Sequence, residues 1–142
     1  MRTVTSKLLL RIAAMIMLLH AIGHTLAIVT WQNSNSKIPA DVIQKMQKTH
    51  FLFQGKDATM ASFFSVHGYA GAILLLLIVS VLWLLSNFND KKSTKILWVV
   101  ALSIVCLAID ELVYFFPMAA AFSFIATTLI FLSIWKIKKS VM

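Results

Sequence analysis

The chain has 142 residues, of which 60% are hydrophobic and 13% are charged, and its mean hydropathy is +0.87. This composition excludes a water-soluble globular domain, in which about a quarter of the residues are charged. The formal net charge is +8, but the basic residues bracket apolar windows and do not gather with aromatic residues on a polar face. We therefore interpret them as topology signals and expect no nucleic-acid partner. The single cysteine, Cys106, excludes an intramolecular disulfide and a cysteine-only metal site within one chain.

Long windows without charge indicate helices that cross a membrane. No charged residue occurs between Arg11 and Lys37, between Asp57 and Asp90, or between Glu111 and Lys136, and each window exceeds the roughly 20 residues that span a bilayer. The N-terminal run is interpreted as a span and not as a cleaved signal peptide, because Arg11 lies deep within it. We predict an all-α fold, a four-helix transmembrane bundle in one domain over residues 1–142, with spans at 8–31, 58–85, 94–116 and 118–135.

Proline and capping residues set the expected ends of these spans. The sequence Phe115-Phe116-Pro117 predicts a break between the third and fourth spans, since proline lacks an N–H group and clashes with the preceding turn. Asp57 and Ser93 are the expected N-caps of the second and third spans.

The connector after the first span is the only long one. Residues 38–53 are expected to form a short amphipathic helix, because apolar positions alternate there with lysines, glutamines and an aspartate. Such a helix lies either in the plane of the membrane surface or folded over the bundle, and in both cases it acts as a lid.

The positive-inside rule gives the expected orientation. With four spans, nine basic residues fall on the side of the two termini and four fall on the other side. This bias predicts cytoplasmic termini and an external lid. The nine are Arg2, Lys7, Arg11, Lys91, Lys92, Lys95, Lys136, Lys138 and Lys139, and the four are Lys37, Lys45, Lys48 and Lys56.

Five ionisable side chains lie inside the predicted spans: His20, His24, His67, Asp110 and Glu111. Helical rise places His20 and His24 about 18 and 24 Å above the cytoplasmic end of the first span, and the other three at similar depths. All five are thus expected in the outer half of the bilayer. Ionisable groups in spans are costly and usually functional, which predicts one shared polar site beneath the lid.

These residue types suit several chemistries. His20, His24 and His67 would supply three imidazole nitrogens to zinc, copper, iron or nickel, and two of them would serve as axial ligands of haem. Asp110 and Glu111 are the expected catalytic residues of an acid–base or metal-dependent enzyme, or the exchangeable proton sites of a transporter. Histidines in spans also bond across helices simply to pack them.

Glycines are expected to allow close approach of helices. Gly68 and Gly71 lie on a small-residue face of the second span. Gly23 is expected to admit a neighbouring helix or a cofactor close to the backbone.

Several short stretches resemble a group of small four-span bacterial membrane proteins to which no activity is assigned. They are His20-Ala21-Ile22-Gly23-His24-Thr25, Met46-Gln47, Phe51-Leu52-Phe53 and Phe115-Phe116-Pro117. In span number the chain is also similar to DoxX-like membrane proteins. The resemblance implies four helices and a bacterial inner membrane.

The sequence therefore predicts a membrane protein with a histidine–carboxylate site that binds a metal, a cofactor or a lipid-soluble ligand, and that is an enzyme in one version. The alternative is a small transporter or an accessory subunit whose polar groups carry protons or only pack helices. Expected partners are the lipid bilayer, a small lipid-soluble ligand, and a second copy or a larger membrane complex.

Overall fold

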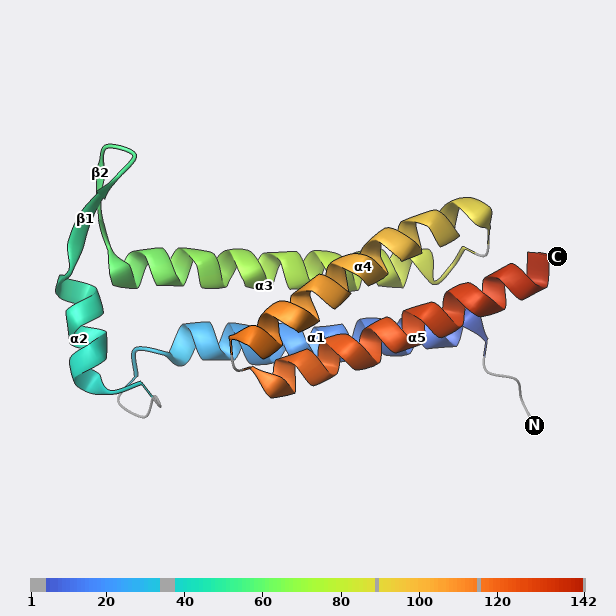
Figure 1. The fold of residues 1–142 in the computed structure, drawn as a ribbon, viewed down its shortest axis with the longest axis horizontal. Helices are drawn as coiled ribbons and strands as arrows, with labels where there is room; N and C mark the ends of the chain where they lie inside the picture. Colours follow the sequence, from blue (N-terminus) through green and yellow to red (C-terminus); the bar gives the residue numbers. More distant parts are fainter. Residues whose placement is uncertain (1–4, 34–37, 89, 115, 142) are drawn as a thin grey trace. The chain divides into compact units, whose positions relative to one another are not determined.

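The computed structural model describes residues 5–33, 38–88, 90–114 and 116–141 (Figure 1). Predictions that fall on Arg2, Lys37 and Phe115 lie outside these residues. The described elements, in chain order, are α1 (Ser6–Thr30), α2 (Ala40–Lys48), β1 (His50–Phe53), β2 (Lys56–Thr59), α3 (Met60–Leu85), α4 (Lys91–Val113) and α5 (Pro117–Val141).

Four of the helices, α1, α3, α4 and α5, are long and apolar enough to cross a membrane. They coincide with the four predicted spans, with ends that differ by at most six residues. The prediction of a mainly helical fold with four long apolar helices is confirmed. The agreement follows from the charge-free windows, because a long apolar segment in lipid satisfies its backbone groups only as a helix or a closed barrel.

The expected break between the last two helices is confirmed. Helix α4 ends at Val113, and Pro117 is the first residue of α5. Proline suits this position, since the first N–H groups of a helix have no partner inside the helix. The backbone N–H of Phe116 donates to the Glu111 carbonyl at 2.7 Å, which closes the turn. The two helices then pack against each other as a helical hairpin.

Helix α4 begins earlier than expected, and the prediction of Ser93 as its N-cap is wrong. Asp90 is the N-cap: its carboxylate accepts from the backbone N–H of Ser93 at 2.6 Å, and the Ser93 hydroxyl accepts from the backbone N–H of Asp90 at 3.2 Å. This reciprocal pair is a capping box. Its main hydrogen bond lowers the pKa of the Asp90 carboxyl below its ordinary value.

The chain forms two compact units. The first contains residues up to 20 and from 75 onward, and the second contains residues 21–74. In the first unit, α4 and α5 bury a core of small and branched residues. Its fully buried members include Ala101, Ile104, Ala108, Ala126 and Ile130.

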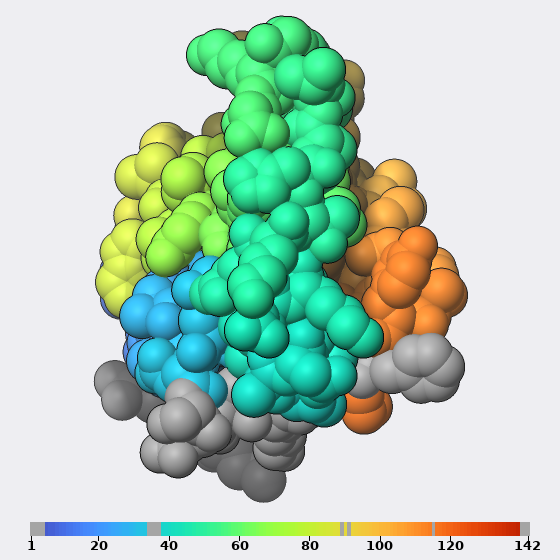
Figure 2. All heavy atoms as spheres, turned by 90° about the vertical axis from the view of Figure 1, so that its left-hand side faces the viewer, coloured from blue at the N-terminus to red at the C-terminus, as the bar shows by residue number. Residues whose placement is uncertain are grey.

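In the second unit, α2 covers the end of α1 and the start of α3. Ile43 of α2 is buried against Trp31 and Ala61, with Ile38 and Met46 packed around them. Figure 2 shows residues 38–59 as one continuous ridge on this face of the molecule. The short helix predicted in this connector is confirmed over Ala40–Lys48 but is wrong over residues 50–53, which form a strand.

The strand belongs to a β-hairpin, β1–β2, that the sequence analysis missed. His50 pairs with Thr59, and Phe53 pairs with Lys56. The two-residue turn has positive φ at both positions, 52° at Gln54 and 77° at Gly55, as a type I′ turn requires. Successive side chains in a strand point to opposite faces.

The face of the hairpin that carries Phe51 and Phe53 packs on helix α3. Both rings contact Phe63 edge to face, at centroid distances of 5.9 and 5.6 Å. Asp57 lies in β2, so its prediction as the N-cap of α3 is wrong. The start of α3 is held instead by Thr59 and Ser62, whose side-chain oxygens each accept the other's backbone N–H.

Candidate functional site

A buried contact between a histidine and a carboxyl group joins α1 to α4 within the first unit. His20 Nε2 lies 3.0 Å from Glu111 Oε1, and the two side chains are only 6% and 9% exposed. The ring of His20 also stacks on Phe122 of α5, with centroids 6.3 Å apart. Both residues were predicted as site residues from the sequence, and the structure brings them together.

Ser123 of α5 completes this cluster. Its side chain is fully buried, and its hydroxyl donates to Glu111 Oε2 at 2.8 Å. The same hydroxyl oxygen lies 3.5 Å from His20 Nδ1. We call these three residues, His20, Glu111 and Ser123, the polar triad. Ser123 was not among the five residues of the predicted site.

The hydrogen count of the polar triad allows two arrangements that keep every contact. The one hydroxyl hydrogen of Ser123 points to Glu111, so the contact with His20 is a hydrogen bond only when Nδ1 carries a hydrogen. One further proton then lies between Nε2 of His20 and Oε1 of Glu111. On the nitrogen it gives an imidazolium–carboxylate pair, and on the oxygen it gives a neutral histidine and a carboxylic acid. The triad can therefore pass this proton across 3.0 Å without losing a hydrogen bond.

Asp110 is exposed, unlike its neighbour Glu111. Adjacent residues on a helix are about 100° apart around the axis, so only one of the two can face α5 and the buried triad. The predicted catalytic pair is thus divided: Glu111 lies in the polar triad and Asp110 does not.

His24 lies in the second unit, where it bridges α1 and α3. Its Nε2 is 3.0 Å from the backbone carbonyl oxygen of Gly68. A carbonyl only accepts, so Nε2 carries the hydrogen and, in the neutral ring, Nδ1 keeps a free lone pair. The ring rests over Gly71, at which an added Cβ would lie 3.0 Å from Nε2. The expected close approach at Gly68 and Gly71 is confirmed, whereas no atom of the described residues lies within 4 Å of a Cβ added at Gly23, so the structure shows no helix close to it.

His67 is exposed on α3, also in the second unit. Its Nδ1 donates to the carbonyl of Phe63 at 2.8 Å, which leaves the lone pair on Nε2. Its ring centroid is 4.2 Å from that of Phe63, the residue on which the hairpin packs. His67 is adjacent to Gly68 and so lies about 100° from it around the axis of α3, turned away from the side that receives His24.

Within the described ranges, no group of three or more histidine, cysteine, aspartate or glutamate side chains is placed to hold a metal ion. The metal set of His20, His24 and His67 stays a prediction. In the structure each of the three rings has a hydrogen-bond partner in the protein, a carboxylate for His20 and a backbone carbonyl for the other two.

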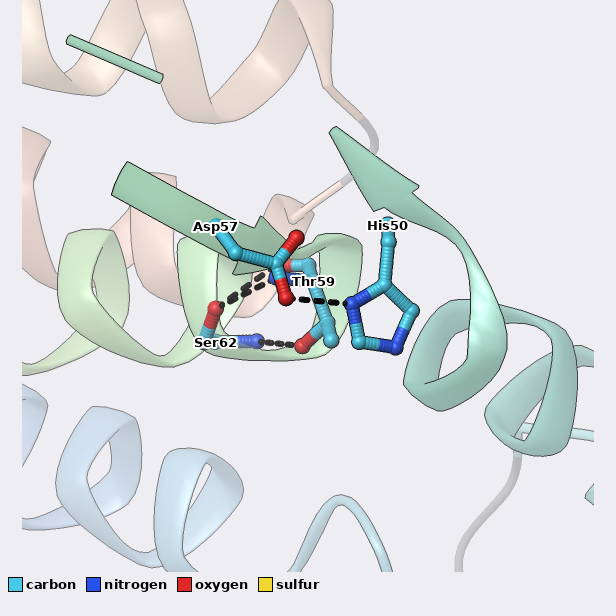
Figure 3. A network of polar contacts seen from close by, with 4 residues as sticks. All are labelled: His50, Asp57, Thr59 and Ser62. Atoms are coloured by element: carbon cyan, nitrogen blue, oxygen red, sulfur yellow. Dashed lines mark hydrogen bonds and ion pairs between the residues drawn. The ribbon is translucent and has the colours of Figure 1, made fainter. Parts of the chain in front are cut away.

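A second polar network lies on the hairpin, on the face opposite Phe51 and Phe53. Figure 3 shows His50 Nδ1 pointing toward Asp57 Oδ2, at 2.8 Å, with the Thr59–Ser62 pair beside it. The two side chains are 57% and 66% exposed. Such exposed pairs contribute little free energy, so this network fixes the hairpin locally.

Comparison of the chain with known protein families, curated proteins and solved structures finds no match.

Proposed function

We propose that this protein is a multi-pass protein of the bacterial inner membrane in which the polar triad binds and releases a proton. It would act as a small proton-coupled transporter or as a proton-handling subunit of a larger membrane complex. The observation that carries the proposal is the 3.0 Å contact between His20 Nε2 and Glu111 Oε1, buried between apolar helices.

Burial supports a functional interpretation of the pair. Ionisable side chains inside apolar segments cost several kcal/mol and are usually retained for transport or catalysis. Glu111 is one of only five acidic residues in the chain. One carboxyl oxygen of Glu111 contacts His20 and the other accepts from Ser123. A proton that enters the triad therefore finds Glu111 as its acceptor, and the hydroxyl of Ser123 holds that carboxyl group in place.

Infrared difference spectroscopy of the protein in liposomes tests the proposal directly. A pH step should change the carboxyl band of Glu111, and Glu111→Gln should remove that change, while Asp110→Asn should keep it. Asp110 is the matched control because it is the adjacent acid and is exposed. A pH-dependent spectrum that is identical in the wild type and in Glu111→Gln would contradict the proposal.

Proton flux distinguishes the transporter from the subunit. Liposomes with a trapped pH indicator and a potassium diffusion potential should acidify faster with the wild type than with Glu111→Gln. Flux equal to that of empty liposomes, together with a Glu111 infrared signal, would assign the protein to a larger complex.

A second candidate function is the binding of a metal, a haem or a lipid-soluble ligand at His24 or, on another side of α3, at His67. The observation in its favour is that a backbone carbonyl fixes one nitrogen of each ring and leaves the other with a lone pair, the arrangement that orients metal-binding histidines. Elemental analysis and an absorption spectrum of the purified protein test it. Equal metal or haem content in the wild type and in His24→Ala would exclude His24 as a ligand.

We also propose cytoplasmic termini and an external α2. A cysteine introduced at Lys45 in a Cys106→Ser background should react with a membrane-impermeant maleimide added outside intact cells. Labelling only after the cells are broken would reverse the orientation.

A further inference from the structure

Arg11 lies in the second turn of α1 and contacts Trp83, near the end of α3. Its guanidinium carbon is 5.0 Å from the centroid of the indole ring, and both residues belong to the first unit. The side-chain Nε of Arg11 is buried and has no hydrogen-bond partner among the described residues. The guanidinium thus has an aromatic contact but an unused donor.

No carboxylate of the described protein neutralises Arg11. The chain contains five acidic residues, Asp41, Asp57, Asp90, Asp110 and Glu111, and all five are described. Their ion pairs join Glu111 to His20 and Asp57 to His50, and none reaches Arg11. An arginine within an apolar helix is costly unless another group neutralises it, so an anion that pairs with Arg11 would come from outside the described protein.

The position of Arg11 indicates which anion is available. It lies five residues after Ser6, where α1 begins, and hence about 7.5 Å along the helix axis. An arginine side chain can extend over that distance to the level of the lipid headgroups. Trp83 lies two residues before the end of α3, and tryptophan is enriched at this level of a membrane. Lys7 precedes Arg11 by four residues, is exposed, and lies on the same face of α1.

We propose that Arg11, Lys7 and Trp83 form a binding site for the phosphate of an anionic phospholipid. The planar guanidinium would hold two phosphate oxygens, which a lysine cannot do with the same geometry. Lys7 supplies a second positive charge, and the indole of Trp83 holds the guanidinium in place and contacts the lipid. This site is separate from the polar triad and does not depend on its function.

Native mass spectrometry of the full chain in detergent tests the site. The protein is mixed with equal amounts of phosphatidylglycerol and phosphatidylcholine that carry the same acyl chains. The wild type should retain phosphatidylglycerol in preference to phosphatidylcholine, and Arg11→Gln should lower that preference about tenfold, the effect expected for losing a charge-assisted hydrogen-bond pair.

Lys139→Gln is the matched control. Lys139 also lies over a tryptophan, with Nζ 5.6 Å from the ring centroid of Trp135, and the substitution removes the same charge. It should leave the preference within about twofold of the wild type, since its exposed ammonium needs no buried anion. An equal loss of lipid preference in Lys139→Gln and Arg11→Gln would show that only the net charge matters and would overturn the proposal.

Two further arms make the result decisive. Arg11→Lys keeps the charge and is the variant to use if Arg11→Gln does not fold. It should lower the preference for phosphatidylglycerol several-fold, because lysine lacks the planar set of N–H donors of the guanidinium. Inorganic phosphate added to the wild type distinguishes the source of the anion. Displacement of the lipid by millimolar phosphate would indicate a site for free phosphate and contradict the lipid assignment. Unchanged lipid retention in both Arg11→Lys and Arg11→Gln would also contradict the proposal.

Discussion

His20 and Glu111 contact each other at 3.0 Å across α1 and α4, while Asp110, next to Glu111 in the chain, is exposed. The two acids should therefore respond differently to substitution. Glu111→Leu leaves the buried ring of His20 without its carboxylate and should destabilise the protein by about 1 to 2 kcal/mol, the range of polar contacts between membrane helices. Asp110→Leu should change stability by less than about 0.5 kcal/mol. Denaturation of both variants in the same mixed micelles measures the difference, and equal losses would contradict it.

The contact of α1 with α3 depends on two glycines of α3. A Cβ added at Gly68 would collide with the side chain of Ile28, and one added at Gly71 would crowd the ring of His24. Gly68→Ala should destabilise the protein by about 1 to 3 kcal/mol, as overpacking does. Gly71→Ala should displace His24 from the Gly68 carbonyl, which would appear as a shifted imidazole resonance in NMR spectra.

Gly23 of α1 provides the control for both glycine substitutions. No atom of the described residues lies within 4 Å of a Cβ added there, so Gly23→Ala should leave stability unchanged or raise it by up to about 1 kcal/mol through helix propensity. A loss in Gly23→Ala as large as that in Gly68→Ala would show that the penalty comes from glycine replacement in general and not from the contact with Ile28.

The four long helices and the break at Pro117 could be predicted from the sequence because charge-free length and proline act locally. The triad could be predicted only in part, since which residue of an adjacent pair faces inward depends on the rotation of the helix. Ser123 could not be assigned to the site from the sequence, because its contact with Glu111 depends on how α5 packs on α4.

The β-hairpin and the start of α4 were missed because the sequence there fits more than one local structure equally well. Residues 50–53 continue the apolar run of α2, and Gln54-Gly55 is a weaker turn signal than Asn-Gly. Asp90 and Ser93 are both good capping residues, and the structure uses both in one capping box, with Asp90 as the N-cap. The grouping of His20 with Glu111, and of His24 with Gly68, depends on contacts between helices that no single segment encodes.

Substitutions at the two turn residues of the hairpin should have opposite effects on its stability. Gln54 has φ of 52°, which costs a side-chain-bearing residue about 1 kcal/mol, whereas glycine accepts it. Gln54→Gly should therefore increase the hydrogen-exchange protection of the hairpin amides, and Gly55→Ala, at φ of 77°, should decrease it. The same change in both variants would show that turn strain does not control this hairpin.

Asp90 should make the start of α4 sensitive to acid. The backbone N–H of Ser93 donates to its carboxylate and is the main cause of its lowered pKa. A pKa that is lower in the folded protein means that the unfolded chain binds more protons, so this contribution to stability is complete above the ordinary pKa of an aspartate and is lost as the pH falls through the lowered value. Hydrogen exchange of the first turn of α4 should therefore accelerate below about pH 4 in the wild type. Asp90→Asn keeps an oxygen that accepts the Ser93 N–H but cannot titrate, so its exchange should show no such acid step. An acid step of equal size in Asp90→Asn would assign the transition to another group.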